Sequence, residues 1–398
     1  MTLRVLHTAD WHLGDRLGGL ERLPDQLARL RELVDHAEAR RADVLLVCGD
    51  VLEEQRPERL APIVAQLGAL LAPSVERGMQ CVFLAGNHDS AHTFALLNGV
   101  QQLLGNERSA ARVQFASRPA LVPLVKDDAV AATLVALPYP TAAAYDLPGD
   151  LRSVAEKRAT LSAAVAACSD ALGERAQREH PGVPRLMAGH FLLGQVAAPT
   201  GLREVAEPED VHVEGAHVER FAYVALGHVH QPLALDEHVR YSGALDRVDF
   251  GEADEPRQAL LVELEDSGAL AVEELPLDAT PMQRVDAGSL AELVEQAQAL
   301  PEPARTIVKL TLRLDHADTA SLWIAEARRG FPRLFEPIEL LRRDEPDPPV
   351  LTGEIEHAAP ADTVRAFLAD QLDADDPDRA AVLALAEELL GEEGLLGR

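Results

Sequence analysis

Two stretches of this sequence decide its expected fold, because each joins a short apolar run directly to polar residues. Residues 44–50 read Val-Leu-Leu-Val-Cys-Gly-Asp, and residues 81–89 read Cys-Val-Phe-Leu-Ala-Gly-Asn-His-Asp. Apolar runs of this length, closed by glycine, are typical of strands that are buried on both faces. Polar side chains directly after such strands predict a site at the carboxyl edge of a sheet.

The same pattern recurs along the first 275 residues. Further short strands are expected at residues 4–7, 134–137, 185–188, 223–226, 240–242 and 259–264, and helices at 23–40, 60–76 and 153–179. This alternation predicts an α/β fold. Polar residues follow five of the strands: Asp10 and His12, then Asp50, then Asn87, His88 and Asp89, then His190, and last His228 and His230. Since loops at the carboxyl edge of a sheet converge, we expect these residues to share one site.

The charge of the chain is unevenly distributed. Its 398 residues include 37 basic and 66 acidic ones, a formal net charge of −29, and 47% are hydrophobic. The hydrophobic content is typical of globular domains. The charge argues against nucleic-acid binding by broad electrostatic attraction, which needs a basic surface. Residues 1–200, however, carry 20 basic and 23 acidic residues, a net charge of only −3, so most of the acidity lies elsewhere.

No targeting or redox signal is expected in this sequence. The first residues lack the basic start and long apolar run of a signal peptide, and no apolar run approaches the roughly 20 residues of a membrane span. A soluble cytoplasmic protein is therefore expected. Cys48, Cys81 and Cys168 have no metal or redox spacing, so buried thiols are the favoured interpretation.

Each polar cluster also has an ordinary interpretation when it is taken alone. In an extended segment, residues two apart face one side, so Asp10 and His12 could hold one cation, although a surface turn is common for such a pair. Asp50 could cap a helix or bridge two cations, and His190 alone would be structural. Together the clusters offer carboxylates, an amide and imidazoles, a mixture that suits Mn²⁺, Fe²⁺ or Zn²⁺ better than Ca²⁺ or Mg²⁺.

The ordered set D-x-H, G-D, G-N-H-D, G-H and G-H-x-H resembles the calcineurin-like metallophosphoesterase superfamily. Within it, the chain is similar to the SbcD family of bacterial nucleases. The residues that carry this resemblance are 7–14 (HTADWHLG), 25–26 (DQ), 86–90 (GNHDS), 223–230 (YVALGHVH) and 241–245 (YSGAL). It is strong over residues 1 to about 275. It implies a metallophosphoesterase β-sandwich flanked by helices.

The resemblance also implies roles for individual residues. One cation would be held by Asp10, His12, Asp50 and His230, and a second by Asp50, Asn87, His190 and His228. His88 would donate a proton to the leaving oxygen, with Asp89 orienting it. The family implies two divalent metal ions, Mn²⁺ above all. One departure is that SbcD chains often continue after Asp50 with Phe-Asp, whereas here Val51 and Leu52 lead to Glu53, which could do the work of that acid.

Three domains are expected from the layout. They are a nuclease domain at 1–276, a small α+β capping domain at 283–344, and a C-terminal helical segment at 350–398. The capping domain should contain helices at 290–300 and 319–329 and strands at 306–314 and near 338–341. The C-terminal segment, with helices at 361–372 and 379–390, is implied to bind the SbcC-type ATPase partner.

Two further surfaces are expected to make contacts. The apolar faces of helices at 57–71 and 93–104 belong either to the core or, as the family implies, to a homodimer bundle. Five arginines of the capping region would suit DNA phosphates or a solvated face: Arg328, Arg329, Arg333, Arg342 and Arg343.

The expected function is therefore that of a two-metal DNA phosphodiesterase. The family implies 3′ to 5′ double-strand exonuclease and single-strand or hairpin endonuclease activity, acting with SbcC in DNA repair, recombination and replication. The net charge predicts weak DNA binding by the chain alone. The alternatives are a small-substrate phosphodiesterase or phosphatase of the same superfamily and a non-catalytic scaffold.

Overall fold

The computed structural model describes residues 2–104, 112–148, 153–194, 211–214, 217–315 and 319–342. Residues 1–340 form one compact unit, and residues 341–398 form a second. The helices expected at 361–372 and 379–390, and Arg343, lie outside the described residues. The three-domain division stays a prediction.

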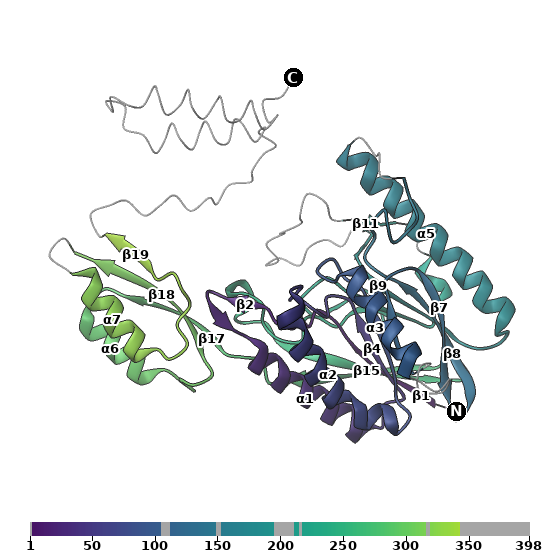
Figure 1. Ribbon diagram of the computed structural model, residues 1–398, viewed down its shortest axis with the longest axis horizontal. Coiled ribbons are helices and arrows are strands. Elements are labelled where there is room, and N and C mark those ends of the chain that lie inside the picture. The colour runs from purple at the N-terminus through teal and green to yellow at the C-terminus, as the bar shows by residue number, and fades with distance from the viewer. Residues whose placement is uncertain are drawn as a thin grey trace. The chain divides into compact units, whose positions relative to one another are not determined.

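Two six-stranded sheets form the centre of the larger unit (Figure 1). The first has the order β16 (Leu270–Leu277), β15 (Arg257–Glu265), β1 (Thr2–Thr8), β4 (Val44–Cys48), β5 (Gln80–Leu84) and β6 (Val113–Ala116). The second has the order β13 (Leu233–Ala234), β14 (Val239–Tyr241), β12 (Tyr223–Gly227), β9 (Arg185–His190), β8 (Ala129–Leu137) and β7 (Ala120–Lys126). Strands β1, β4, β5 and β6 run parallel, as do β8, β9, β12 and β14. Parallel strands share a carboxyl edge, so their loops meet there.

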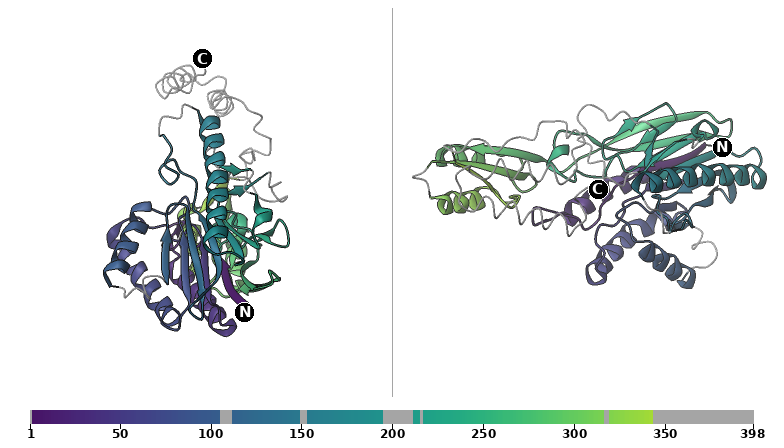
Figure 2. Two further views of the ribbon diagram at one scale, coloured as in Figure 1. Left: turned by 90° about the vertical axis from the view of Figure 1, so that its right-hand side faces the viewer. Right: turned by 90° about the horizontal axis from the view of Figure 1, so that it is seen from above.

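Helices lie on the outer faces of the two sheets (Figure 2), and buried apolar side chains pack between the sheets and beneath the helices. Val5 and Leu46 of the first sheet and Leu186 and Ala225 of the second belong to one buried core. Helices α1 (Leu23–Arg40), α2 (Pro57–Glu76) and α3 (Ala91–Leu104) cover the other face of the first sheet, and α5 (Val154–Glu179) covers the second. Burial on both faces explains why strands such as β4 are continuously apolar. The predicted α/β sandwich flanked by helices is confirmed.

Strands β6, β7 and β16 were absent from the sequence prediction. All three lie at sheet edges, and two contain a proline, Pro123 in β7 and Pro276 in β16. Proline weakens a strand signal because it lacks the N–H that a central strand must donate, and it is tolerated at an edge. The strands and helices predicted in the described residues are otherwise present within a few residues of their expected ends.

A smaller three-stranded sheet follows the sandwich. It contains β17 (Met282–Ala287), which was not predicted, β18 (Ile307–Leu314) and β19 (Glu339–Arg342), and it packs with α6 (Leu290–Ala299) and α7 (Ala320–Gly330) around its own core. The remaining short elements are β2 (Arg16–Leu17), β3 (Leu20–Glu21), β10 (Leu192–Leu193), β11 (His212–Val213), and the 3₁₀ turns η1 (Val218–Arg220) and η2 (Phe250–Glu252).

Arg333, expected either on DNA phosphates or on a solvated face, makes an internal contact in the structure. Its guanidinium donates to the Asp25 carboxylate of α1 at 3.0 Å and to the Arg305 carbonyl at 2.7 Å. Arg328 pairs with Glu336 at 2.9 Å. These pairs satisfy the charges locally. Among the described residues, no helix has the length and apolar character of a membrane span; the cytoplasmic location stays a prediction.

One buried histidine lies between the sheets. His7 of β1 is fully buried, accepts a hydrogen bond from the Tyr223 hydroxyl at Nδ1 (2.9 Å) and donates from Nε2 to the Leu226 carbonyl (3.2 Å). These two bonds suit a neutral imidazole. Burial accordingly lowers the pKa of His7 to about 3.

This shifted pKa predicts a specific loss of stability in acid. Between about pH 6.5 and pH 3 the unfolded chain binds a proton at His7 that the folded chain does not, so stability falls as the pH falls. Relative to His7→Gln, the wild type should lose about 2–3 kcal/mol more unfolding free energy between pH 7 and pH 4.5, since each pKa unit corresponds to about 1.4 kcal/mol. Urea denaturation at both pH values measures this. His92→Gln, at an exposed position of α3, is the control; equal losses in His7→Gln and wild type would contradict the account.

Candidate metal centre

The predicted polar residues converge beyond the carboxyl ends of β1, β4, β5, β9 and β12. Asp10 and His12 follow β1, Asp50 follows β4, and His190 is the last residue of β9. One ligand atom from each of Asp10, Asp50 and His190 lies within 4.8 Å of the others, and the same holds for Asp10, His12 and His230. All of these side chains except His230 are buried. The strand pattern thus brings together residues that are up to 220 positions apart.

The backbone of the site is mostly left-handed, not extended as the spacing of Asp10 and His12 suggested. Asp10, His12, Asp50 and His228 have φ angles of 53°, 44°, 50° and 87°. Non-glycine residues adopt this conformation at an energetic cost, and such residues cluster at functional sites. Backbone bonds hold it here: the Asp10 N–H donates to the Gly49 carbonyl at 3.0 Å, and the His12 N–H donates to the Asp50 carbonyl at 2.9 Å.

Two glycines allow the loops to approach one another. At Gly49, whose φ is 93°, an added Cβ would lie 2.0 Å from Nδ1 of His190. At Gly86 it would lie 2.0 Å from an oxygen of the Asp50 carboxylate. Real side chains do not come this close, so these positions must lack a Cβ for His190 and Asp50 to occupy their places.

The Asp50 carboxylate stands between the two groups of candidate ligands. Its Oδ2 lies 3.3 Å from Nε2 of His190 and 3.7 Å from Nε2 of His12. On one side, Nε2 of His12 is 3.2 Å from Nε2 of His230. The other side holds Asn87, whose Oδ1 is 2.9 Å from Nε2 of His190 and 3.2 Å from Nδ1 of His228. A carboxylate in this position could bridge two cations.

The orientation of three histidines fits metal binding. Nδ1 of His12 lies 2.9 Å from the Glu53 carboxylate, Nδ1 of His230 lies 2.7 Å from the Glu252 carboxylate, and Nδ1 of His190 lies 2.7 Å from the Cys48 carbonyl. Each Nδ1 can therefore donate its proton to an oxygen, which leaves the lone pair of Nε2 directed at the cluster. Metal-ligating histidines are held in this way by a carboxylate or a carbonyl behind them.

The buried carboxylates of the cluster are stabilised by positive charge on neighbouring groups. Burial alone would raise the pKa of Asp50, but His190 and His12 hold the pKa of this carboxyl well below its usual range. Burial lowers the pKa of His190, yet Asp50 and Asp10 outweigh it and raise that pKa to about 9. Opposing shifts of this kind are expected where buried carboxylates and imidazoles offset each other's desolvation. Divalent cations would supply the same positive charge.

Glu53, not Asp89, contacts His88. The Asp89 carboxylate accepts bonds from the N–H groups of Gly86, Val51 and Leu52 at 2.9–3.1 Å, so it ties the two loops together. The expected role of Asp89 in orienting His88 stays a prediction, and the carboxylate found in contact with His88 is that of Glu53. Oε2 of Glu53 lies 2.9 Å from Nδ1 of His88 as well as from Nδ1 of His12. This contact raises the pKa of His88 to about 9.

Sequence reasoning missed Glu252 altogether. It lies 22 positions beyond His230, on the turn η2, and no spacing rule connects the two. Gln26 of α1 was noticed only through the family resemblance. Its side chain donates to the His12 carbonyl at 2.7 Å and accepts from the Gly14 N–H at 3.0 Å, so it supports the loop that carries Asp10 and His12.

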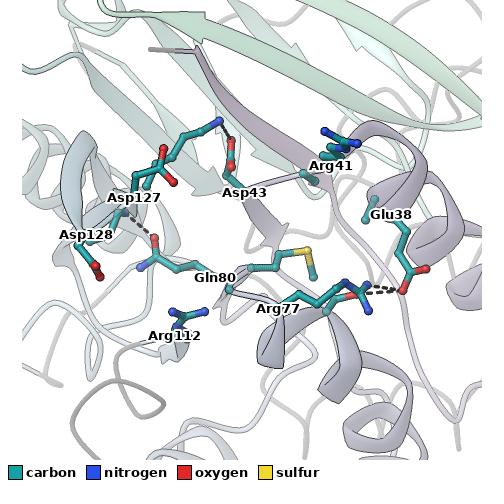
Figure 3. Close-up of a pocket in the computed structure, with 15 residues that line it drawn as sticks. Glu38, Arg41, Asp43, Arg77, Gln80, Arg112, Asp127 and Asp128 are labelled. Carbon is teal, nitrogen blue, oxygen red and sulfur yellow. Dashed lines mark hydrogen bonds and ion pairs between the residues drawn. The ribbon is translucent and has the colours of Figure 1, made fainter.

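A cavity of about 1050 Å³ lies away from this centre (Figure 3). It adjoins Asp43 and Gln80, at the start of β4 and β5, whereas the ligands follow the other end of these five-residue strands, roughly 16 Å away. Four of its charged side chains form ion pairs with one another, Lys126 with Asp43 at 2.8 Å and Arg77 with Glu38 at 2.5 Å. It is not part of the cluster.

Comparison with known proteins connects this geometry to a family. The sequence model of the calcineurin-like phosphoesterases matches residues 3–232. The SbcD component of the nuclease SbcCD from Rhodobacter capsulatus is 33% identical over 347 residues, which cover 80% of this chain and 82% of that protein. The SbcD component of the nuclease SbcCD from Escherichia coli K12 is 25% identical, over 85% of this chain and 84% of that protein. A solved dimetal phosphatase from Danio rerio aligns with 69% of this chain and 96% of its own, at 12% identity and a TM-score of 0.39.

The close approach at Gly49 predicts a local and specific failure. Gly49→Ala should displace the His190 ring, weaken Mn²⁺ binding by at least about tenfold and lower the unfolding free energy, because a buried clash commonly costs about 1–3 kcal/mol. Gly19→Ala is the matched control, since Gly19 has a similar φ of 83° but open space around its Cβ position. Calorimetric titration with Mn²⁺ and urea denaturation measure both effects. Equal behaviour of the two variants would contradict the proposed contact.

Proposed function

The chain belongs to the calcineurin-like phosphoesterases and, within them, to the SbcD family, and from this we propose that it is a metal-dependent nuclease that hydrolyses DNA phosphodiesters. The observation that carries the proposal is the position of the Asp50 carboxylate, between the imidazoles of His12 and His190. Around it lie the other carboxylate and imidazole side chains that the sequence predicted as ligands. Such a cluster is the protein's part of a two-cation hydrolytic site.

We assign the first cation to Asp10, His12, Asp50 and His230, and the second to Asp50, Asn87, His190 and His228. When bound, two divalent cations supply Lewis acidity and offset the charge that develops on the phosphoryl oxygens. Mn²⁺ is the ion we favour, because imidazole, amide and carboxylate ligands are mixed in the set. The chain's own residues hold the ligands in place beforehand, through Gln26, Glu53 and Glu252.

His88 is the proton donor in this proposal. Its Nδ1 is bound by Glu53, so its Nε2 can face the substrate and protonate the leaving oxygen. The side chain is 42% exposed, as a group that meets substrate should be, whereas four of the proposed ligands, Asp10, His12, Asp50 and His190, are buried. General acid catalysis by a positioned imidazole typically contributes about 10²–10⁴-fold in rate.

Substrate and partner follow from the relatives. Two proteins matched over more than four-fifths of their length are named as subunits of the nuclease SbcCD, so we propose that this chain acts with an SbcC-type ATPase on DNA ends and hairpins, as a 3′ to 5′ exonuclease and single-strand endonuclease. The chain's charge of −29 supports reliance on a partner for holding DNA. A small-substrate phosphatase on the same scaffold is the second candidate.

The exposed faces of α2 and α3 support a homodimer. Leu96 and Val100 of α3 expose 66% and 42% of their surface, and Gly68 of α2 and Gly99 of α3 have open space around their Cβ positions. Ile63, Leu67 and Phe94 of the same helices are buried in the core, so the outer faces are additional to core packing. We propose that a second copy covers them.

His88→Ala tests the function directly. The variant should bind two Mn²⁺ ions as the wild type does, because the proposal gives His88 no ligand role although it lies beside His12 and Asp50. It should cleave end-labelled duplex and hairpin DNA at least about 100-fold more slowly, since the proton donor is gone. His92→Ala, with an exposed imidazole on α3, is the control. Turnover of His88→Ala near the wild-type rate would refute the role of His88, and hydrolysis of small phosphate esters without DNA cleavage in wild type would favour the phosphatase.

Leu96→Asp tests the dimer. A carboxylate at the centre of an apolar interface cannot be buried without a partner, so the variant should be monomeric at concentrations where the wild type sediments as a dimer. Val154→Asp replaces an apolar residue that is 49% exposed on α5 and should leave the dimer intact. Sedimentation velocity distinguishes the two; a monomeric wild type, or a dimeric Leu96→Asp variant, would contradict the assignment.

A further inference from the structure

Glu252 connects a candidate ligand to the interior of the protein. Its Oε1 lies 2.7 Å from Nδ1 of His230, and its Oε2 accepts the Val248 N–H at 2.8 Å and a short bond from the Arg257 guanidinium. Only 14% of the Glu252 side chain is exposed. The carboxylate is thus fixed from three directions, and His230 is the only one of its three contacts that faces the metal centre.

Arg257 is the unusual part of this arrangement. It is the first residue of β15, and its side chain is completely buried. The guanidinium also contacts the Glu255 carboxylate at 3.2 Å and the Pro256 carbonyl at 3.1 Å. Burying an arginine is costly unless it is paired, and here its shortest contact is to the carboxylate that holds His230. The pair holds the Glu252 side chain in one orientation, and with it the imidazole of His230.

The two groups of ligands are supported unequally. Behind His12 and His230, in the first group, stand the carboxylates of Glu53 and Glu252. Nδ1 of His190, in the second group, meets the neutral Cys48 carbonyl. A carboxylate partner makes a ligating imidazole a stronger donor than a neutral carbonyl does, and it adds negative charge close to the cation. The first group should therefore hold its cation more tightly.

We infer that Glu252, fixed by Arg257, is a positioning residue that makes the Asp10, His12 and His230 site the tighter of two cation sites, so that the two ions bind in order. This inference rests on the proposed function for the two-cation assignment and adds the order of loading and its cause. At low metal concentration the protein then carries one ion, and the second site, at Asn87 and His190, determines when the centre is complete.

The first test is a calorimetric Mn²⁺ titration of the metal-free full-length wild type, without DNA, with the bound ions counted by electron paramagnetic resonance. Two binding events should appear, with dissociation constants that differ by about tenfold or more. Two events of equal affinity would overturn the inference. A wild type that binds no Mn²⁺ would overturn both the inference and the proposed function, whereas ordered binding without DNA cleavage would count against the proposed function alone.

Glu252→Gln then identifies the cause. It should weaken the tighter event by about 10–100-fold and leave the weaker event unchanged, because loss of a carboxylate behind a metal-bound histidine has an effect of this size. Glu255→Gln is the matched control, since Glu255 contacts the same guanidinium but not His230; it should titrate as the wild type. A Glu252→Gln protein that binds both ions normally, or loses both equally, would overturn the inference.

Glu252→Asp gives an independent measurement should the glutamine variant unfold. It keeps the negative charge that Arg257 requires and withdraws the carboxylate from His230 by one methylene. The tighter event should again weaken by at least about tenfold while the thermal midpoint stays within a few degrees of the wild type. Unchanged affinity in a folded Glu252→Asp protein would contradict a positioning role.

Discussion

The buried carboxylate of Asp50 is the constraint on which the site depends. Asp50 follows the central parallel strand β4, and only 2% of the residue is exposed. Its negative charge must therefore be balanced inside the protein. Imidazoles from the ends of β1 and β9 lie within 3.7 Å of it. The loops that follow five strands are therefore held close to one point, and a phosphodiester brought to that point would meet concentrated positive charge once cations are bound.

Packing of the two sheets stabilises the strained backbone of the metal-site loops. Four non-glycine residues at the site have left-handed backbone angles, and such residues cost on the order of 1–3 kcal/mol each. They persist because the strands before them are buried on both faces and because backbone bonds from Gly49 and Asp50 hold the Asp10–His12 loop. The buried strands thus position the loops that carry the candidate ligands. The side chains of Gln26, Glu53 and Glu252 then hold the His12 backbone and the imidazoles of His12 and His230 in place.

Much of this could be predicted from the sequence, since continuous apolar runs mark β4, β5 and β12 and polar residues mark their ends. The edge strands β7 and β16 were missed because proline and alternating burial obscure them. The family resemblance implied that Asp89 orients His88, whereas the carboxylate in contact with His88 is that of Glu53, from a different loop, and Asp89 accepts a backbone N–H group. Glu252 could not be found, because its contact with His230 exists only when η2 folds back onto the β12 loop.

The central claim is that this cluster holds two cations that share Asp50. A crystal structure of the Mn²⁺-loaded protein, with diffraction data collected at the manganese absorption edge, tests it most directly. Two anomalous peaks should flank the Asp50 carboxylate, one among Asp10, His12 and His230 and the other among Asn87, His190 and His228, roughly 3.5–4 Å apart. Data from fully loaded crystals with no peak at Asp50, or with manganese only at other surfaces, would contradict the account.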